Sequence, residues 1–146
     1  MSFIRIWIHF VWATYRRYPY LNQVIRPSVF KHIKEYANSK SIYLDEINGY
    51  FDHVHCLVSM NANQNAASIA NLLKGESSRW INKNELIKTG FAWGDKYYAA
   101  SVSHSHVNII RNYIRNQEEH HKKKSSIQEF DDLAEEFGID NLGPEL

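Results

Sequence analysis

A strand that carries two histidines two residues apart is the feature of this sequence that most limits its fold. Residues 47–60 are rich in apolar and β-favouring side chains and are predicted to contain one buried strand. Side chains alternate between the two faces of a strand, so His53 and His55 project from the same face, about 6.6 Å apart along it. Two imidazoles on an apolar strand are costly to bury unless a metal ion, a phosphate or a hydrogen-bond partner satisfies them. An ordinary hydrogen-bonded surface pair is the alternative.

Length and composition indicate one folded domain. The chain has 146 residues, of which 44% are hydrophobic and 14% aromatic. No stretch approaches the roughly 20 apolar residues of a membrane span, and residues 1–9 lack the features of a secretory signal. Cys56, the single cysteine, allows no internal disulfide, and alternation along the strand directs it into the core, away from the histidines. We therefore expect a cytoplasmic protein that is not bound to a membrane.

Charge is distributed unevenly along the chain. Residues 125–146 contain seven acidic residues and no lysine or arginine, whereas residues 1–124 contain 17 basic and 9 acidic residues, a balance of +8. A basic body favours a polyanionic partner, and an acidic tail could pack against it or tune binding. Ordinary solvated faces are the alternative. We predict a main domain over residues 1–124 and an acidic C-terminal helix and tail over residues 125–146.

Hydrophobic spacing predicts a regular alternation of strands and helices. Strands are expected over residues 3–14, 41–49, the histidine segment up to residue 60, and 91–101, with a hairpin turn at Asn48-Gly49. Helices are expected over residues 27–39, 65–82, from Ser103 to about His121, and 127–137. The order β-α-β-β-α-β predicts an α+β, ferredoxin-like (RRM-like) antiparallel sheet with appended C-terminal helices.

The predicted third helix carries a second pair of polar residues. Tyr113 and Gln117 are four residues apart and therefore neighbours on one helix face. A tyrosine at the edge of a core usually has only a structural role. Beside the histidine strand, however, the pair suggests a phenol nucleophile and an amide oxygen that completes a metal site.

These motifs resemble a known family. His53-Val54-His55 matches the His-hydrophobic-His motif of HUH endonucleases, and Tyr113 with Gln117 matches their single-tyrosine helix. Segments 10–17, 73–79 and 93–98 add matches in the expected order over roughly residues 3–120. Together they resemble the small single-tyrosine transposases of the insertion-sequence 200/605 group and the related REP-associated tyrosine transposases.

The resemblance implies a transposase that cleaves and rejoins single-stranded DNA at hairpin-bearing ends. His53, His55 and Gln117 would hold a divalent metal ion, Mg²⁺ or Mn²⁺, that polarises the scissile phosphate. Tyr113 would attack phosphorus and form a covalent phosphotyrosine, although no general base is evident. A homodimer is also implied, with the tyrosine acting either in its own subunit's site or in the partner's.

Contacts to DNA are expected from the basic body. Phosphates would be neutralised by Arg16, Arg17, Lys74, Arg79 and Lys83. Unpaired bases could stack on Tyr15, Tyr18 and Trp93, although Trp93 is as well suited to the core. A second His-x-His, at residues 104–106, and the pair His120-His121 are interpreted as solvated.

Three alternatives remain open. A non-catalytic nucleic-acid-binding module would place aromatic residues on the sheet face, where this chain has histidines. A two-histidine phosphoesterase needs two His-x-Thr/Ser motifs, and His55-Cys56-Leu57 does not supply one. A domesticated relative that nicks DNA hairpins for its host cannot be separated from an active transposase by sequence.

Overall fold

The computed structural model describes residues 2–122, 125, 128, 129 and 132. Its main elements are, in chain order, β1 (Ile6–Ala13), α1 (Arg26–Ser39), β2 (Tyr43–Tyr50), β3 (His53–Met60), α2 (Ala66–Lys83), β4 (Tyr98–Val102), α3 (Val107–Arg115) and α4 (Gln117–His121). A short 3-10 turn at Tyr15–Arg17 follows β1, and another at His104–His106 precedes α3. Most of the acidic helix predicted over residues 127–137 lies outside the described residues. Within the described part of the chain, no helix is long and apolar enough to cross a membrane.

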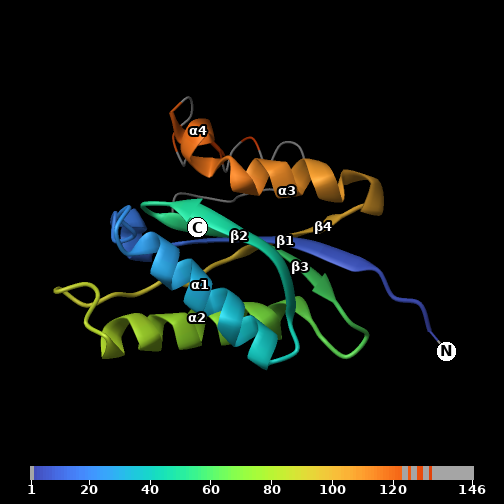
Figure 1. The fold of residues 1–146 in the computed structure, drawn as a ribbon, viewed down its shortest axis with the longest axis horizontal. Coiled ribbons are helices and arrows are strands. Elements are labelled where there is room, and N and C mark those ends of the chain that lie inside the picture. Colours follow the sequence, from blue (N-terminus) through green and yellow to red (C-terminus); the bar gives the residue numbers. More distant parts are fainter. Residues whose placement is uncertain (1, 123–124, 126–127, 130–131, 133–146) are drawn as a thin grey trace.

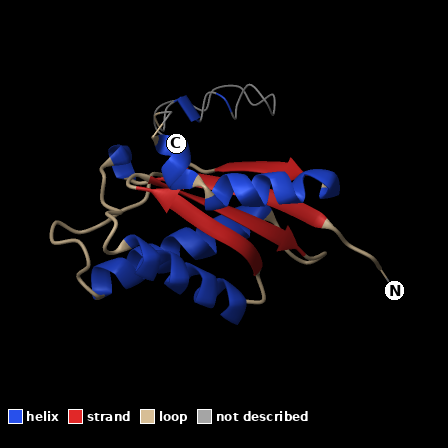
Figure 2. Cartoon of the chain, turned by 45° about the horizontal axis from the view of Figure 1, so that its top comes forward, coloured by secondary structure: helices blue, strands red, loops and turns tan. Residues whose placement is uncertain are grey.

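The strands form one four-stranded antiparallel sheet in the order β2-β3-β1-β4. Helices α1 and α2 cover one face of the sheet, and α3 and α4 lie over the other (Figure 1, Figure 2). The predicted α+β class is therefore confirmed. The histidine strand β3 has a hydrogen-bonded neighbour on each side, with His55 opposite Val11 of β1 and Asn48 of β2. Its position is thus fixed from both edges.

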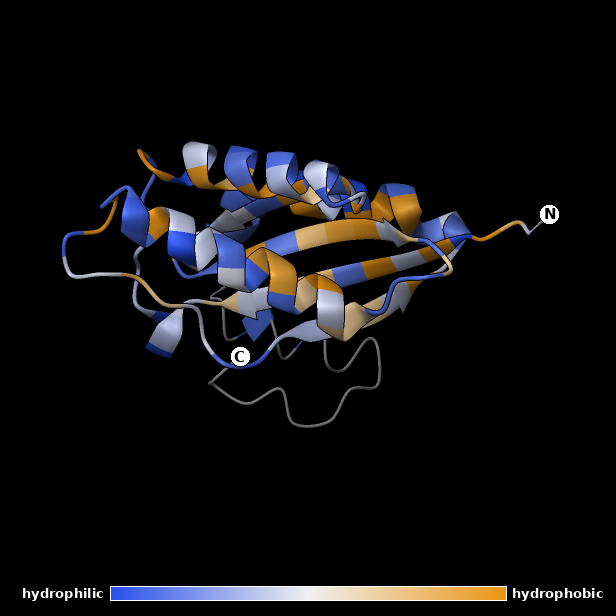
Figure 3. Ribbon diagram, turned by 90° about the horizontal axis from the view of Figure 1, so that it is seen from below, coloured by the Kyte–Doolittle hydropathy of each residue, from blue (hydrophilic) through white to orange (hydrophobic). Residues whose placement is uncertain are grey.

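Alternation along β3 divides its side chains between two apolar clusters. Val54, Cys56 and Val58 belong to the larger cluster, under α1 and α2. Figure 3 shows the apolar residues of the strands behind these helices. Leu57 belongs to a smaller cluster on the other face, with Val102, Val107, Ile110 and Ile114. Cys56 is completely buried, as predicted, and burial raises the pKa of its thiol.

The turn between β2 and β3 lies at residues 51–52, so the prediction of a turn at Asn48-Gly49 is wrong. Both residues lie inside β2 and pair with β3. A Cβ atom at Gly49 would lie 2.2 Å from the backbone oxygen of His53 and 3.0 Å from Cζ of Phe30. Glycine is needed here because other backbone and side-chain atoms approach closely, not because the chain turns.

The strand predicted over residues 91–101 is shorter in the structure, because β4 begins only at Tyr98. The preceding loop is attached to the rest of the fold in two ways. An isolated bridge joins Trp93 to Thr14 after β1. The Asn82 side chain of α2 also accepts a 2.8 Å hydrogen bond from the backbone N–H of Phe91 and donates a 2.9 Å hydrogen bond to its backbone oxygen. Side-chain hydrogen bonds of this kind replace the sheet pairing that the β-favouring composition suggested.

The long helix predicted from Ser103 to about His121 is divided into a 3-10 turn and two helices. Ser103 precedes the 3-10 turn but makes no side-chain capping hydrogen bond. The main break is at Asn116, which has φ −99° and ψ 28° and separates α3 from α4. Gln117, directly after the break, begins α4 and is completely buried.

Candidate active site

Two parts of the fold meet at the candidate site: β3 supplies two histidines, and α3 and α4 supply a tyrosine and a glutamine. His53 and His55 are both completely buried. The Tyr113 ring of α3 lies 5.5 Å from the His55 ring, centroid to centroid. Oε1 of Gln117 lies 3.1 Å from Nε2 of His53. The tyrosine, the histidines and the glutamine singled out in the sequence therefore lie together within one chain.

Polar contacts to β2 hold the tyrosine helix over the histidines. Nε of Arg111 lies 2.7 Å from a carboxylate oxygen of Asp45, and Nε of Arg115 lies 2.7 Å from one of Glu46. The Asn48 side chain donates a 3.1 Å hydrogen bond to the backbone oxygen of Arg115. Because β2 is hydrogen-bonded to β3, these contacts connect the tyrosine helix to the histidine strand through the sheet.

The His53 ring is held at both nitrogen atoms. Nδ1 lies 2.8 Å from the Asp52 carboxylate, while Nε2 faces the amide oxygen of Gln117. The Gln117 amide nitrogen is 3.4 Å from the backbone oxygen of Tyr113, and this contact turns the amide oxygen toward His53. When Nδ1–H donates to Asp52, Nε2 presents a lone pair, so two acceptors face each other. A cation or a further proton between them would satisfy both.

His55 is placed by another histidine, His9 of β1. Nε2 of His9 lies 2.8 Å from Nδ1 of His55, and His9 is also completely buried. Burial lowers the pKa of both rings, and the proximity of His55 lowers the pKa of His9 further. Both rings are therefore neutral at neutral pH. Within the described residues, Nε2 of His55 makes no hydrogen bond of normal geometry, although it lies 2.6 Å from Oε1 of Glu129.

Glu129 enters the site from the acidic tail. Its carboxylate is almost completely buried, accepts a 2.5 Å hydrogen bond from the Tyr113 hydroxyl and lies 2.5 Å from Nε2 of His121. Burial alone would raise the pKa of Glu129, but its close contacts with His55 and His121 lower it well below its usual value. Glu129 is therefore ionised. The charge pattern indicated that the tail could pack against the basic body, but no local motif identified this residue.

The Tyr113 hydroxyl is protonated in this arrangement. Burial raises the pKa of Tyr113 well above its usual value, and the Glu129 carboxylate raises it further. A phenolate beside an ionised carboxylate would place two negative charges in contact. Deprotonation of Tyr113 therefore requires that Glu129 move away or that a cation compensate its charge.

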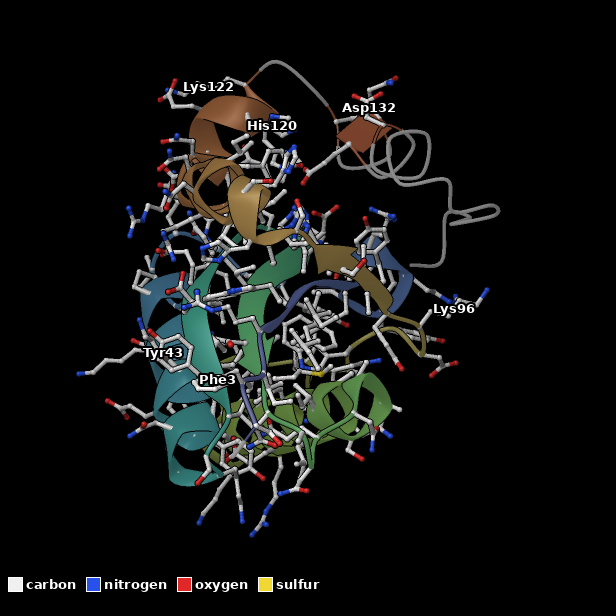
Figure 4. The ribbon with its side chains drawn as sticks, turned by 90° about the vertical axis from the view of Figure 1, so that its right-hand side faces the viewer. Phe3, Tyr43, Lys96, His120, Lys122 and Asp132 are labelled. Carbon is white, nitrogen blue, oxygen red and sulfur yellow. The ribbon has the colours of Figure 1, made fainter. Side chains whose placement is uncertain are left out.

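The histidines at the end of α4 are not both solvated, so that prediction is wrong. The His121 side chain is only 2% exposed, and its Nε2 lies 3.2 Å from Nε2 of His53. Its ring stacks on Tyr50 with centroids 4.6 Å apart. His120 is partly buried, with its ring 4.9 Å from that of Tyr113. In Figure 4, His120 and Asp132 lie at the same end of the molecule.

A metal ion fits this group of side chains. One ligand atom from each of His53, His55 and Glu129 lies within 4.8 Å of the others. Gln117 adds an amide oxygen 3.1 Å from Nε2 of His53. Imidazole nitrogens combined with amide and carboxylate oxygens suit divalent ions such as Mn²⁺. Glu129 was not among the predicted ligands, whereas Gln117 was.

Among the cationic residues predicted to contact DNA, Arg16 and Arg17 lie at the histidine end of the sheet. They follow β1, whose last residue pairs with His53. Both have left-handed backbone conformations, with φ of 50° and 55°. Tyr15 and Tyr18, on either side of them, are each 43% exposed. This turn exposes Arg16 and two aromatic rings, whereas the terminal guanidinium nitrogens of Arg17 are buried.

The other predicted DNA-contacting residues lie elsewhere. Lys74, Arg79 and Lys83 are on α2, which covers the opposite face of the sheet (Figure 1). Nζ of Lys74 donates a 2.7 Å hydrogen bond to the backbone oxygen of Gly94, and burial lowers its pKa. Trp93 is buried, and its indole N–H donates to a serine of α2. The structure therefore brings only Arg16 and Arg17 of this set to the histidine end of the sheet.

A tyrosine, two histidines and an amide oxygen thus lie together on one face of the sheet. The sheet with helices on both faces provides the frame for this group. In a comparison with family profiles, residues 2–117 match the family described as "Transposase IS200 like". The chain belongs to this family, as the sequence motifs indicated.

Two solved structures share the fold. A candidate transposase from Deinococcus radiodurans R1 is 23% identical, with a TM-score of 0.65, over 80% of this chain and 93% of that one. A REP-associated tyrosine transposase bound to a REP hairpin is 15% identical, with a TM-score of 0.61, over 98% of this chain and 89% of that one. Comparison with the curated proteins gives no match.

Proposed function

We propose that this protein is a metal-dependent transposase that cleaves single-stranded DNA at hairpin-bearing ends and rejoins it through a covalent phosphotyrosine. One observation carries the proposal. The Tyr113 hydroxyl and Nε2 of His55 lie 2.5 and 2.6 Å from the same oxygen of Glu129, and Nε2 of His53 lies 3.6 Å from the other. A phosphate in the position of this carboxylate would meet the nucleophile and the metal-binding histidines together. Membership of the transposase family supports DNA as the substrate.

In the proposed cleavage step, Oη of Tyr113 attacks the scissile phosphorus. The Oη–P bond forms as the P–O3′ bond breaks, and the departing strand ends in a 3′-hydroxyl. The proton lost by the phenol is balanced by the proton gained by the 3′ oxygen. Rejoining is the reverse reaction, in which a 3′-hydroxyl attacks the phosphotyrosine and releases Tyr113.

The other site residues prepare this step. His53, His55 and Gln117 would hold a divalent metal ion, Mg²⁺ or Mn²⁺, which when bound supplies Lewis-acid polarisation of the phosphate. The contacts between α3 and β2 keep the Tyr113 ring beside the histidines. Glu129 must leave the Tyr113 hydroxyl before phosphorus can approach it, because its carboxylate occupies that position.

DNA binding is proposed for the turn after β1. Arg16 is exposed and would neutralise a phosphate, and Arg17 would do so once its buried guanidinium nitrogens turn outward. The exposed rings of Tyr15 and Tyr18 would stack on unpaired bases. A similar solved structure is bound to a REP hairpin, which supports hairpin-bearing DNA as the ligand. Lys74, Arg79 and Lys83 would require DNA to reach the other side of the sheet.

The proposed function also concerns the oligomeric state and the biological role of the protein. A homodimer is proposed, but it is not needed to complete the site, because the tyrosine and histidines of one chain already meet. The same chemistry would serve a mobile element or a domesticated protein acting at scattered palindromes. Palindromic ends that flank the gene would indicate the former, and palindromes dispersed through the genome the latter.

The function is tested by incubating purified protein with a hairpin-bearing single-stranded oligonucleotide. Cleavage is expected with Mn²⁺ or Mg²⁺ and should stop when EDTA removes the metal. A covalent protein–DNA band should appear on a denaturing gel only under the conditions that permit cleavage. Cleavage of duplex DNA alone, or undiminished cleavage in EDTA, would contradict the proposal.

Removing the Glu129 carboxylate is expected to accelerate cleavage at saturating Mn²⁺. Glu129→Ala frees the Tyr113 hydroxyl from a charged hydrogen bond, which contributes about 1.5 kcal/mol or more. A gain of that size corresponds to about a tenfold increase in the single-turnover rate, measured on an oligonucleotide. Glu119→Ala, which removes an exposed carboxylate of α4, should leave the rate unchanged. Loss of cleavage in Glu129→Ala would instead make this carboxylate an essential metal ligand.

A further inference from the structure

His9 is a buried histidine that the proposed mechanism does not use. It lies on β1, has no exposed surface, and its ring is 6.2 Å from that of Tyr113, centroid to centroid. A buried imidazole without good hydrogen bonds costs free energy that an apolar residue would avoid. Among the described residues, the only side-chain hydrogen bond of His9 joins its Nε2 to Nδ1 of His55, at 2.8 Å. The contact with His55 is therefore the feature that can account for a histidine at this position.

The two histidines of β3 are supported in the same way. Asp52 contacts Nδ1 of His53 at 2.8 Å, and His9 contacts Nδ1 of His55 at the same distance. In both rings Nδ1 therefore has a partner. Nε2 of His53 is directed toward Gln117, and Nε2 of His55 toward Glu129. Metal-binding histidines in proteins commonly have such a partner on the second nitrogen, which fixes both the ring orientation and the position of its proton.

The position of the proton distinguishes two states of the His9–His55 pair. A neutral imidazole carries one proton. If His9 Nε2–H donates to His55, the His55 proton lies on Nε2, which then cannot bind a metal. If His55 Nδ1–H donates to His9, Nε2 of His55 is free to act as a ligand, and the His9 proton lies on Nδ1. Nδ1 of His9 has no hydrogen-bond partner among the described residues, so no other contact fixes which state it adopts.

We propose that His9 is a positioning residue for the metal site: it accepts the Nδ1 proton of His55 and so holds Nε2 of that ring toward the ion. This inference rests on the proposed function, because it assigns His9 to the metal site of the same reaction. Imidazole suits the role because its Nε2 can donate when Glu129 fills the site and accept when a metal does. Asp52, with a carboxylate, performs the accepting role for His53.

The test uses two substitutions of similar length, His9→Met and His9→Gln, in the full chain. Methionine fills the space but is a poor acceptor, whereas the glutamine amide oxygen can accept the His55 proton. Mn²⁺ affinity, measured by direct titration without DNA, is expected to fall about 10- to 100-fold in His9→Met and to recover largely in His9→Gln. Val102→Ala, a truncation in the cluster under α3, controls for loss of packing and should retain the affinity.

A second measurement follows the proton itself. Ring ¹⁵N spectra with a diamagnetic divalent ion should place the His55 proton on Nδ1 in the unaltered protein and lose that fixed assignment in His9→Met. Unchanged Mn²⁺ affinity in a folded His9→Met variant would overturn the positioning role and leave the proposed function intact. Failure of the unaltered protein to bind any divalent ion would overturn the proposed function itself, and this inference with it.

Discussion

The Tyr113→Phe variant is expected to lose cleavage by at least about a thousandfold, as enzymes do when their nucleophile is removed. The substitution deletes the attacking oxygen and retains the ring that packs beside His55. The lost hydrogen bond to the Glu129 carboxylate should lower the free energy of unfolding by about 1.5 kcal/mol, which is too little to unfold the domain. The measurement is the covalent protein–DNA band on a denaturing gel, which should be absent while thermal unfolding remains close to that of the unaltered protein.

A neighbouring tyrosine provides the matched control for this variant. Tyr98 is buried on β4, with its ring 5.8 Å from that of His9, so Tyr98→Phe removes the same atom from a nearby ring. It should retain the covalent band. Persistence of the band in Tyr113→Phe would show that Tyr113 is not the nucleophile, and Tyr97 or Tyr98 would become the next candidate.

The His55→Ala variant is expected to lose both metal binding and cleavage while still binding DNA. His55 supplies one of the two imidazoles in the metal group, and loss of metal polarisation should cost about 3 kcal/mol of transition-state stabilisation, roughly a 100-fold loss of rate. The proposed DNA binding would depend on many phosphate contacts and should therefore change little. Single-turnover cleavage, Mn²⁺ titration and electrophoretic mobility shift separate these effects. His106→Ala, at an exposed histidine before α3, should alter none of them.

Mixing the two inactive variants shows whether sites are shared between subunits. Tyr113 lies beside His55 of its own chain, so a mixture of His55→Ala and Tyr113→Phe should remain inactive. Restored cleavage would mean that the tyrosine helix is exchanged between the chains of a dimer, because only a trans site could then contain both residues.

The histidine strand illustrates what the sequence could predict. Alternation placed His53 and His55 on one face and Cys56 on the other, and burial in the structure agrees. The spacing of Tyr113 and Gln117 correctly indicated neighbours, although Asn116 breaks the helix between them. Both results depend on local periodicity, which survives small changes in the length of an element.

The errors have different physical causes. Asn48-Gly49 has the composition of a turn, but its glycine satisfies a close contact with β3 and α1, which only tertiary packing reveals. The β-favouring residues before Tyr98 form a loop because side chains of α2 hydrogen-bond its backbone. Local composition could not distinguish these outcomes.

The candidate site was incomplete for a similar reason. His9, His121 and Glu129 are far from the His-x-His motif in sequence, and none lies in a spacing typical of metal ligands. They meet the motif only because β1 is adjacent to β3, α4 follows a helix break, and Glu129 lies against His55. Such partners become visible only once the strand order is known.

The two faces of the sheet also differ in the amino-acid substitutions that they can tolerate. Even-numbered positions of β3 face α1 and α2, where substitutions need only preserve volume and apolar character. The odd-numbered positions at its beginning carry His53 and His55, the proposed metal ligands, whose atoms must remain within a few tenths of an ångström of their places. Attempts to raise the melting temperature of this protein should therefore be confined to the α1–α2 side, where an evolving or engineered sequence can change extensively without altering the chemistry on the opposite face.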